Sequence, residues 1–127
     1  MLIEDLIKSY HIEEKVTLKV EIDELDIGLK TLVPLGLIIN EIMSNSMKHA
    51  FNDSGGVISV EIRNLETNRF EMIIGDDGKG LAGVVESTGF GHEFIEIFTE
   101  QLNGEIQQLD RQGTFYHLVF ESLEDAQ

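Results

Sequence analysis

The sequence predicts an α+β fold, a two-layer sandwich in which helices cover one face of a mixed, mostly antiparallel β-sheet. Two long stretches carry apolar residues at the spacing of amphipathic helices. Shorter stretches alternate apolar and polar residues, as half-buried strands do. Most of these strand stretches follow one another across short turns, which is typical of antiparallel neighbours.

The expected elements occupy most of the chain. In order they are a helix at 2–10, a strand at 16–22, a long helix at 32–50, strands at 57–63 and 70–74, a helix at 92–102, and a hairpin of 105–109 with 114–120. The first strand shows the alternation most clearly, because Val16, Leu18 and Val20 are separated by polar residues.

The two long helices have clear apolar faces. Pro34 is expected in the first turn of the 32–50 helix, where a missing N–H costs nothing. The buried face of that helix would comprise Leu35, Ile38, Ile39, Ile42 and Met43. Gly75 would end the strand before the glycine-rich stretch, and Gly104 would end the second long helix.

Composition limits the possible functions. The 127 residues contain no cysteine, one proline and no internal repeat, so we expect a single domain over 1–127. No apolar run approaches the roughly 18 residues of a membrane span, and the start is not that of a signal peptide. We expect a cytoplasmic domain whose parent protein can be membrane-attached. Nine basic against 24 acidic residues give a net charge of −15, which disfavours nucleic acid and membrane partners.

Polar residues form a stripe on the 32–50 helix. Glu41, Asn45 and Lys48 are spaced so that their side chains line up, and His49 borders them. The carboxylate can accept a proton, the amide oxygen can ligate Mg²⁺, and the ammonium can meet a phosphate. A solvated helix face would have the same composition, so the stripe alone leaves both interpretations open.

An acidic turn follows the 70–74 strand, in Gly75-Asp76-Asp77-Gly78-Lys79-Gly80. Neighbouring side chains of a strand point in opposite directions, so only one of Asp76 and Asp77 can face inward. An inward carboxylate beside an apolar pocket can accept a hydrogen bond from the exocyclic amine of adenine. An exposed acidic turn is the alternative interpretation of this segment.

Further glycines precede the second long helix. Gly89-Phe90-Gly91 runs into it, and N–H groups at a helix N-terminus can bind an anion, although glycine is also ordinary before a helix. Residues 78–83 match the spacing of a dinucleotide fingerprint, but 84–88 is too short for the required helix. The pattern of a calcium loop is also missing.

Taken in order, these segments resemble the sequence boxes of the GHKL (Bergerat) ATP-binding fold of histidine kinases and DNA gyrase. Residues 35–51 resemble its N box, 76–81 its first glycine box, 89–104 its second, and Gly113-Thr114 its closing strand. The resemblance covers about residues 30–120. It looks closest to the ATP-binding (HATPase) domains of bacterial sensor histidine kinases in the HWE and related subfamilies.

The resemblance implies a role for each polar residue of the N box. Glu41 would be the catalytic base that helps to activate the attacking nucleophile. Asn45 would ligate the Mg²⁺ that bridges the ATP phosphates, and Lys48 and His49 would lie near those phosphates. ATP and Mg²⁺ are therefore the expected cofactors.

The glycine boxes would build the rest of the site. Asp76 would accept the hydrogen bond of the adenine amino group, with Thr114 supporting it. The four glycines implied to shape the lid and phosphate turn are Gly78, Gly80, Gly89 and Gly91. The sequence departs from the family at Asp77, where Asn is frequent, at His92, where leucine is usual, and at Asn103, where glycine is common.

The resemblance also implies a reaction and partners. The chain would transfer the ATP γ-phosphoryl group to a histidine on a separate dimerisation domain, and from there to a response regulator receiver domain, in two-component signalling. None of the four histidines has the context of that acceptor, so the acceptor histidine is not expected in this chain. A serine kinase of the anti-sigma-factor type and a non-catalytic interaction module of the same fold are the alternatives.

Overall fold

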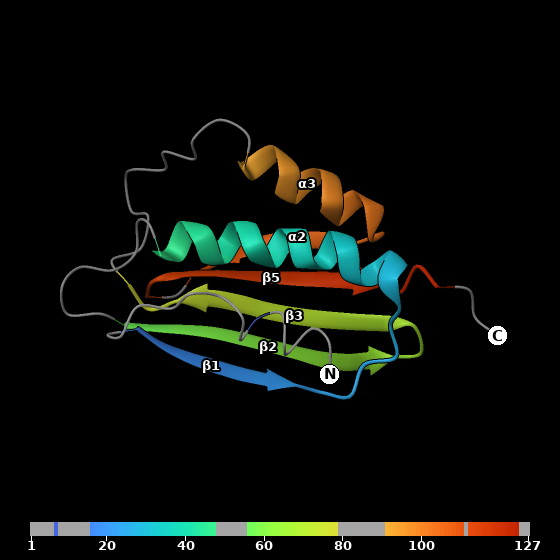
Figure 1. Ribbon diagram of the computed structural model, residues 1–127, viewed down its shortest axis with the longest axis horizontal. Coiled ribbons are helices and arrows are strands. Elements are labelled where there is room, and N and C mark those ends of the chain that lie inside the picture. The colour runs from blue at the N-terminus through green and yellow to red at the C-terminus, as the bar shows by residue number, and fades with distance from the viewer. Residues whose placement is uncertain (1–6, 8–15, 48–55, 79–90, 111, 125–127) are drawn as a thin grey trace.

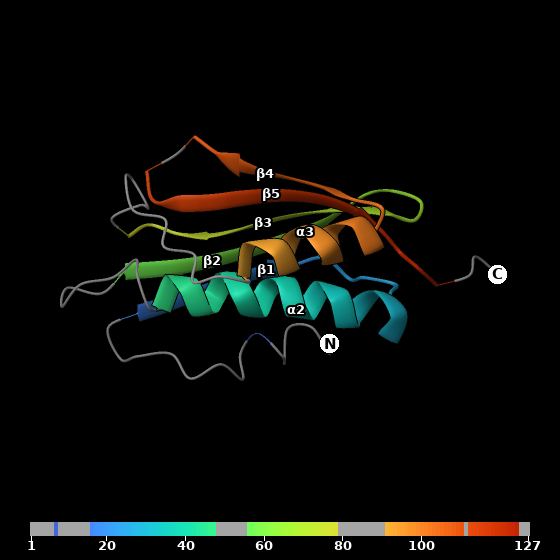
Figure 2. The ribbon, with the colours of Figure 1, turned by 90° about the horizontal axis from the view of Figure 1, so that it is seen from above.

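The molecule has two layers, a sheet and a pair of helices on one of its faces (Figure 1). The computed structural model describes residues 7, 16–47, 56–78, 91–110 and 112–124. Seen from above, the two helices run side by side over the sheet (Figure 2). The predicted α+β sandwich is confirmed. The helix expected at 2–10 lies outside the described residues except for Ile7, which is fully buried.

Five strands form one mixed sheet in the order β1-β2-β3-β5-β4. The strands are β1 (Val16–Ile22), β2 (Gly56–Glu66), β3 (Arg69–Asp76), β4 (Glu105–Leu109) and β5 (Thr114–Glu121). β1 pairs with β2 in parallel, and the other neighbours are antiparallel. The β3–β5 register sets Asp76 opposite Thr114, which brings two of the expected site residues together.

The core lies between the sheet and the helices α2 (Leu29–Asn45) and α3 (Gly91–Gln101). The predicted apolar face of α2 is buried at every position. It packs on the inward side chains of the central strands, which include Ile58, Ile62, Met72, Ile74, Leu118 and Phe120. The rings of Phe70 and Phe120 stack at 5.4 Å between centroids. Among the described residues, no helix is long and apolar enough to cross a membrane.

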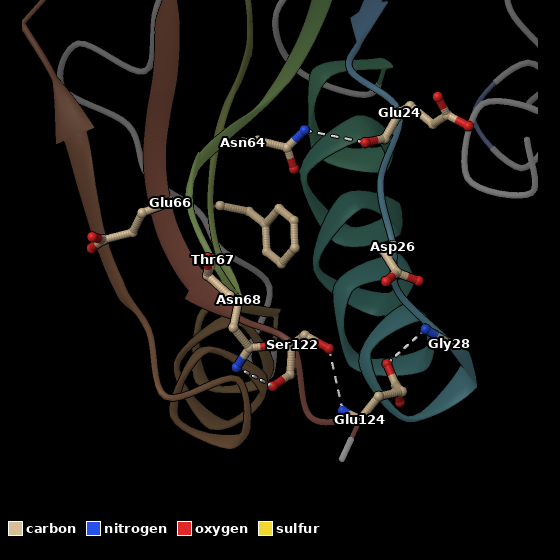
Figure 3. A pocket seen from close by; sticks show the side chains of 10 residues that line it. Glu24, Asp26, Gly28, Asn64, Glu66, Thr67, Asn68, Ser122 and Glu124 are labelled. Atoms are coloured by element: carbon tan, nitrogen blue, oxygen red, sulfur yellow. Dashed lines mark hydrogen bonds between the residues drawn. The ribbon is translucent and has the colours of Figure 1, made fainter. Parts of the chain in front are cut away.

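Helix α2 begins three residues earlier than expected, at Leu29, so Pro34 lies in its second turn and not its first. The reason is a cap from the other end of the chain. Gly28, at the N-cap position, has no side chain. Glu124 Oε1 accepts a hydrogen bond from the Gly28 N–H at 2.6 Å (Figure 3) and another from the Thr31 hydroxyl at 2.6 Å. A carboxylate at a helix N-terminus satisfies free N–H groups and the helix dipole.

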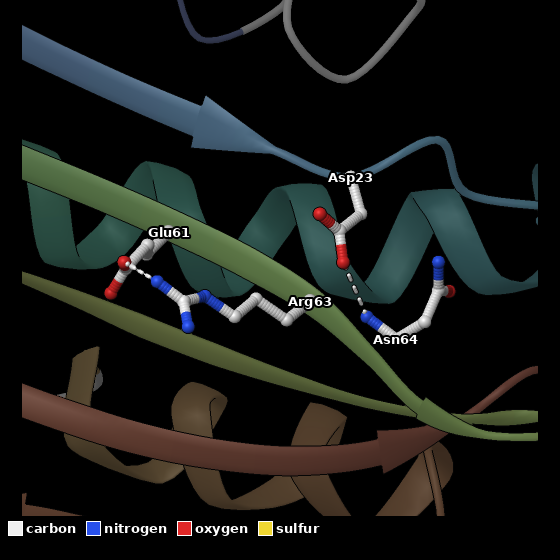
Figure 4. Close-up of polar contacts among 4 residues, drawn as sticks. All are labelled: Asp23, Glu61, Arg63 and Asn64. Atoms are coloured by element: carbon white, nitrogen blue, oxygen red, sulfur yellow. Dashed lines mark hydrogen bonds and ion pairs between the residues drawn. The ribbon is translucent and has the colours of Figure 1, made fainter.

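The loop after β1 is tied to β2 by three hydrogen bonds. The Asp23 N–H donates to the Ile62 carbonyl at 2.9 Å, and the Asn64 N–H donates to Asp23 Oδ2 at 3.0 Å (Figure 4). The Asn64 side-chain amide donates to the Glu24 carbonyl at 3.1 Å. These bonds fix the path from the edge strand to the start of α2.

Two predicted element ends are corrected. Strand β3 does not stop at Gly75 but continues to Asp76, because Gly75 still pairs with Ser59 and Phe115. A Cβ at Gly75 would lie 2.2 Å from the Thr114 carbonyl oxygen, so glycine permits this close pairing. At the end of α3 the left-handed residue is Asn103 (φ 51°) and not Gly104. Asparagine tolerates this conformation, which explains its place in the motif.

Candidate functional site

The site is centred on Asp76, the last residue of β3. Its side chain turns to the helix-covered face of the sheet and is 1% exposed, whereas Asp77 is exposed. The strand alternation predicts that one of the two acids faces inward, and the structure shows that it is Asp76.

Both oxygens of the Asp76 carboxylate accept hydrogen bonds. Oδ2 accepts from the Ser46 hydroxyl at 2.5 Å, and Oδ1 accepts from the Gly78 N–H at 3.0 Å. Burial raises the pKa of Asp76, and the bonds from Ser46, Gly78 and the Thr114 N–H counteract part of this rise. The charge of Asp77 also raises this pKa. The result is a buried carboxyl group that still has acceptor capacity for a ligand.

Asp77 forms hydrogen bonds to the neighbouring strand β2 at the end of the sheet. Its Oδ1 accepts from the Val57 N–H at 2.7 Å, and its own N–H donates to the Val57 carbonyl at 3.1 Å. The acid that stands where the resemblance gives asparagine therefore pairs β3 with β2.

The start of β5 passes directly against Asp76. Gly113 has φ +95°, and a Cβ there would lie 2.1 Å from the Asp76 carbonyl oxygen. Only glycine fits this approach. Next along the strand, Thr114 is 7% exposed and pairs with Asp76 in the sheet register. Burial, followed by the nearby Asp76 charge, raises the pKa of Tyr116, so this phenol remains neutral.

The last turns of α2 form the opposite wall. Ser46 is 5% exposed and contacts Asp76, whereas Glu41 and Asn45 are partly exposed one turn apart on the same helix. The structure thus brings Ser46, Asp76, Gly78 and Thr114 into one hydrogen-bonded cluster, and Asn45 directly precedes Ser46 at the end of α2.

The remaining expected site residues lie in α3 or outside the described residues. Gly91 is the first residue of α3. Lys48, His49, Gly80 and Gly89 lie outside the described residues. We expect Glu41, Asn45 and Asp76 to line one cavity, and this expectation stays a prediction. The neighbouring segment of the chain, 79–90, also lies outside the described residues.

Sequence reasoning missed Ser46, and it named Gly113 only as part of the closing strand, without its close contact with Asp76. Both left a signal. Ser46 continues the buried face of α2 one turn beyond Ile42 and Met43, and a hydroxyl at such a position must find a partner. Gly113 precedes the final strand, where a positive φ closes the hairpin from β4.

The described residues of the site suit a metal ion that is held mainly by a bound nucleotide and by few protein atoms. In the part of the chain that the structure describes, no group of three or more His, Cys, Asp or Glu side chains gathers as a metal cage. Asn45 offers one amide oxygen at the partly exposed end of α2. Mg²⁺ is commonly bound through one or two protein oxygens together with water and substrate phosphates, so this donor set fits Mg²⁺ on a nucleotide.

A separate cavity of about 700 Å³ lies at the other end of α2 (Figure 3). Its walls are the loop before α2, the β2–β3 turn and the C-terminal segment. Four carboxylate residues line it, namely Glu24, Asp26, Glu66 and Glu124. The acidic lining does not suit an anionic nucleotide, so this cavity is not the candidate site.

The arrangement of the sheet and the two helices is similar to that of solved histidine kinase domains. The histidine kinase domain of the blue-light activated kinase EL346 from Erythrobacter litoralis superposes with a TM-score of 0.74 at 20% identity, over 86% of this chain and 52% of that one. The mycobacterial sensor histidine kinase MprB gives a TM-score of 0.70 at 15% identity, over 94% of this chain and 90% of that one. These likenesses confirm the predicted fold.

Two curated relatives extend the comparison to sequence. Blue-light-activated histidine kinase 2 of Erythrobacter litoralis is 28% identical over 74 residues, 56% of this chain. The chain spans only 21% of that kinase. The anti-sigma F factor of Anoxybacillus flavithermus is 25% identical over 119 residues, 83% of this chain and 80% of the factor. No family model matches the chain. The expected resemblance to histidine kinase ATP-binding domains is confirmed.

Proposed function

We propose that this chain binds Mg²⁺-ATP and transfers its γ-phosphoryl group to a histidine on a separate dimerisation domain. The buried Asp76 carboxylate carries the proposal. It lies at the end of the central strand β3 and is held by Ser46 and Gly78, and Ser46 directly follows Asn45 of the polar stripe on α2. The likeness to histidine kinase domains supports the same function.

In this proposal, residues at the end of the sheet recognise the adenine base. Asp76 accepts a hydrogen bond from the exocyclic amine of adenine, because the bonds it already accepts leave an acceptor site free. Thr114, directly opposite in the register, supports this contact. Gly78 lets the backbone pass close to the base. A carboxylate in this place selects a base that donates.

The phosphates lie toward the polar stripe of α2. Asn45 contributes an amide oxygen to Mg²⁺, and Lys48 and His49 lie near the phosphates in this proposal. Gly80, Gly89 and Gly91 shape the turn that covers them. Backbone N–H donors carry much of the anion binding, since the chain has only nine Lys and Arg against 24 acids. Bound Mg²⁺ neutralises phosphate charge.

The chemical step is an in-line transfer. A nitrogen–phosphorus bond forms to the acceptor imidazole, the bond from the γ-phosphorus to the bridging oxygen breaks, and ADP leaves. Glu41 accepts a hydrogen bond or proton from the imidazole N–H and so raises the nucleophilicity of the ring. The phosphoryl group then passes to the receiver domain of a response regulator. The acceptor histidine and the receiver are partners of the chain, in cis or in trans.

Calorimetric titration with a non-hydrolysable ATP analogue and Mg²⁺ tests the site. We expect Asp76→Asn to weaken binding by roughly 10- to 100-fold, because the amide presents a donor where the adenine amine needs an acceptor. Asp77→Asn is the matched control, since its side chain bonds to Val57 on β2, and it should change affinity only a few-fold. Equal affinities for the Asp76 variant and the parent would refute the adenine contact.

A phosphorylation assay with a supplied acceptor domain tests the chemistry. We expect Glu41→Gln and Asn45→Ala to lower transfer by on the order of 100-fold while the fold is retained. Glu100→Gln, an exposed residue of α3, serves as the control and should transfer normally. Unchanged transfer in both variants would remove Glu41 and Asn45 from the mechanism.

The anti-sigma F factor relative favours a second function, phosphorylation of a protein serine. That relative covers a larger share of this chain than the curated histidine kinase does. Phosphohistidine is acid-labile and phosphoserine is acid-stable. Acid treatment of the phosphorylated acceptor therefore separates the two functions. Failure to bind any adenine nucleotide would instead indicate a non-catalytic interaction module.

A further inference from the structure

Ser46 is a buried serine at the end of α2, and the proposed phosphoryl transfer does not use it. It is 5% exposed and follows the buried face of the helix. Its hydroxyl lies 2.5 Å from Asp76 Oδ2, in a buried bond between segments 30 residues apart in sequence. Hydrogen bonds from a hydroxyl to a carboxylate are among the stronger ones in proteins.

The hydrogen-bond geometry directs the hydroxyl proton of Ser46 to Asp76. The carboxylate of Asp76 has about four lone-pair sites, and it accepts from Ser46, from Gly78 and from the Thr114 N–H, so an acceptor site remains for a ligand. The single hydroxyl proton of Ser46 is directed to Asp76, so its Oγ has only lone pairs left to offer. Toward a ligand, the pair presents acceptors alone.

We propose that Ser46 is a positioning residue that keeps Asp76 ionised and oriented, so that the pair selects purines with a 6-amino group over purines with a 6-oxo group. The proposal rests on the nucleotide-binding function and names a determinant of its base specificity. A 6-oxo group is itself an acceptor and finds no donor in the Ser46–Asp76 pair. A 6-amino group donates to either oxygen.

The electrostatic surroundings make the contribution of Ser46 necessary. Burial is the largest influence on Asp76 and raises its pKa, and the Ser46 hydroxyl is the strongest influence that opposes it. Asp77, next in the chain, raises this pKa as well, and Tyr116 on β5 is neutral. The remaining opposition comes from the N–H groups of Gly78 and Thr114.

Loss of the hydroxyl therefore has a specific chemical consequence. Without Ser46, Asp76 takes up a proton at a higher pH. A protonated carboxyl group carries an O–H donor, which can bond to a 6-oxo purine and no longer favours the amine in the same way. Base selectivity should then depend on pH.

The first experiment measures Asp76 in the nucleotide-free chain. A ¹³C titration of its carboxyl carbon, assigned with Asp76→Asn, should give a higher midpoint in Ser46→Ala than in the parent. Ser46→Thr keeps a hydroxyl and should restore the parental midpoint. Ser44→Ala, two residues earlier on the same helix, is the control and should leave it unchanged. An identical midpoint in the parent and Ser46→Ala would overturn the proposal.

The second experiment measures selectivity with non-hydrolysable ATP and ITP analogues, which differ in the 6-amino and 6-oxo groups. In Ser46→Ala the preference for ATP should fall on acidification from pH 8 to pH 5.5, by roughly tenfold more than in the parent. A uniform loss of affinity at every pH would indicate a structural role and contradict the proposal. If the parent binds neither analogue, nucleotide binding and base selection both fail, while the carboxyl titration still decides whether Ser46 controls Asp76.

Discussion

The two ends of helix α2 hold a carboxylate in the same way and to opposite effect. At its start, Glu124 accepts from the Thr31 hydroxyl and the Gly28 N–H. At its end, Asp76 accepts from the Ser46 hydroxyl and the Gly78 N–H. Each group thus accepts from one hydroxyl and from backbone N–H groups. Yet the pKa of Glu124 is lowered, whereas the pKa of Asp76 is raised.

The surroundings of the two carboxylates explain the difference. For Glu124, desolvation works to raise the pKa, but the bonds from Thr31, Gly28 and the first turn of α2 together outweigh it. The positive end of the helix dipole favours the charge there. Asp76 is buried near the opposite end of α2, where the dipole of this helix does not favour a negative charge, and Asp77 lies beside it. One carboxylate stabilises the fold, whereas the other is kept at a cost in stability and is available to a ligand.

The largest effect on stability is expected from a substitution that disturbs the backbone beside Asp76. Gly113→Ala would place a Cβ 2.1 Å from the Asp76 carbonyl oxygen at φ +95°, so β5 must move away from β3. We expect the free energy of unfolding to fall by about 2–4 kcal/mol, measured by urea denaturation. Gln112→Ala, an exposed neighbour in the same turn, should be near neutral. Equal stability of the two variants would contradict the close approach.

Sequence patterns predict the parts of this molecule that depend on neighbours along the chain. The apolar faces of α2 and the strands follow from periodicity, as does the inward direction of one of the two acids at 76 and 77. The start of α2 could not be predicted, because the group that caps it, Glu124, lies 96 residues from Gly28. The Ser46–Asp76 bond was missed for the same reason, since a tertiary contact decides which of several serines is buried against a carboxylate.

The second prediction concerns the contact of Glu124 with the start of α2. Glu124→Gln keeps an acceptor oxygen but removes the charge, so the free energy of unfolding at pH 7 should fall by about 1 kcal/mol. Because the folded pKa of Glu124 is lowered, its contribution is fully present above the unfolded pKa and is lost as the pH falls through the folded value. Parent and variant should therefore converge in acid, at pH values below the lowered pKa of Glu124. Denaturation at neutral pH and in acid measures this, with exposed Glu100→Gln as control. A pH-independent difference would mean that the charge plays no part.

The smallest effect, and the sharpest contrast, is expected from Asp76→Asn. The raised pKa of Asp76 means that the folded chain binds its proton more tightly than the unfolded chain does, so the ionised group lowers stability at neutral pH. The amide removes this charge while Ser46 and Gly78 can still bond to it. We expect a gain of roughly 0.5–1 kcal/mol at pH 7 that disappears as the pH falls below the unfolded value near 3.8.

Urea denaturation across this pH range measures the gain, with Asp110→Asn in the exposed β4–β5 turn as control. Glu124→Gln and Asp76→Asn should then differ in sign at neutral pH and both approach the parent in acid. A loss of stability in Asp76→Asn would show that the hydrogen bonds of the charged form outweigh its burial. In that case Asp76 would stabilise the fold as Glu124 does, and the cost in stability that distinguishes a ligand-binding carboxylate from a capping one would be absent.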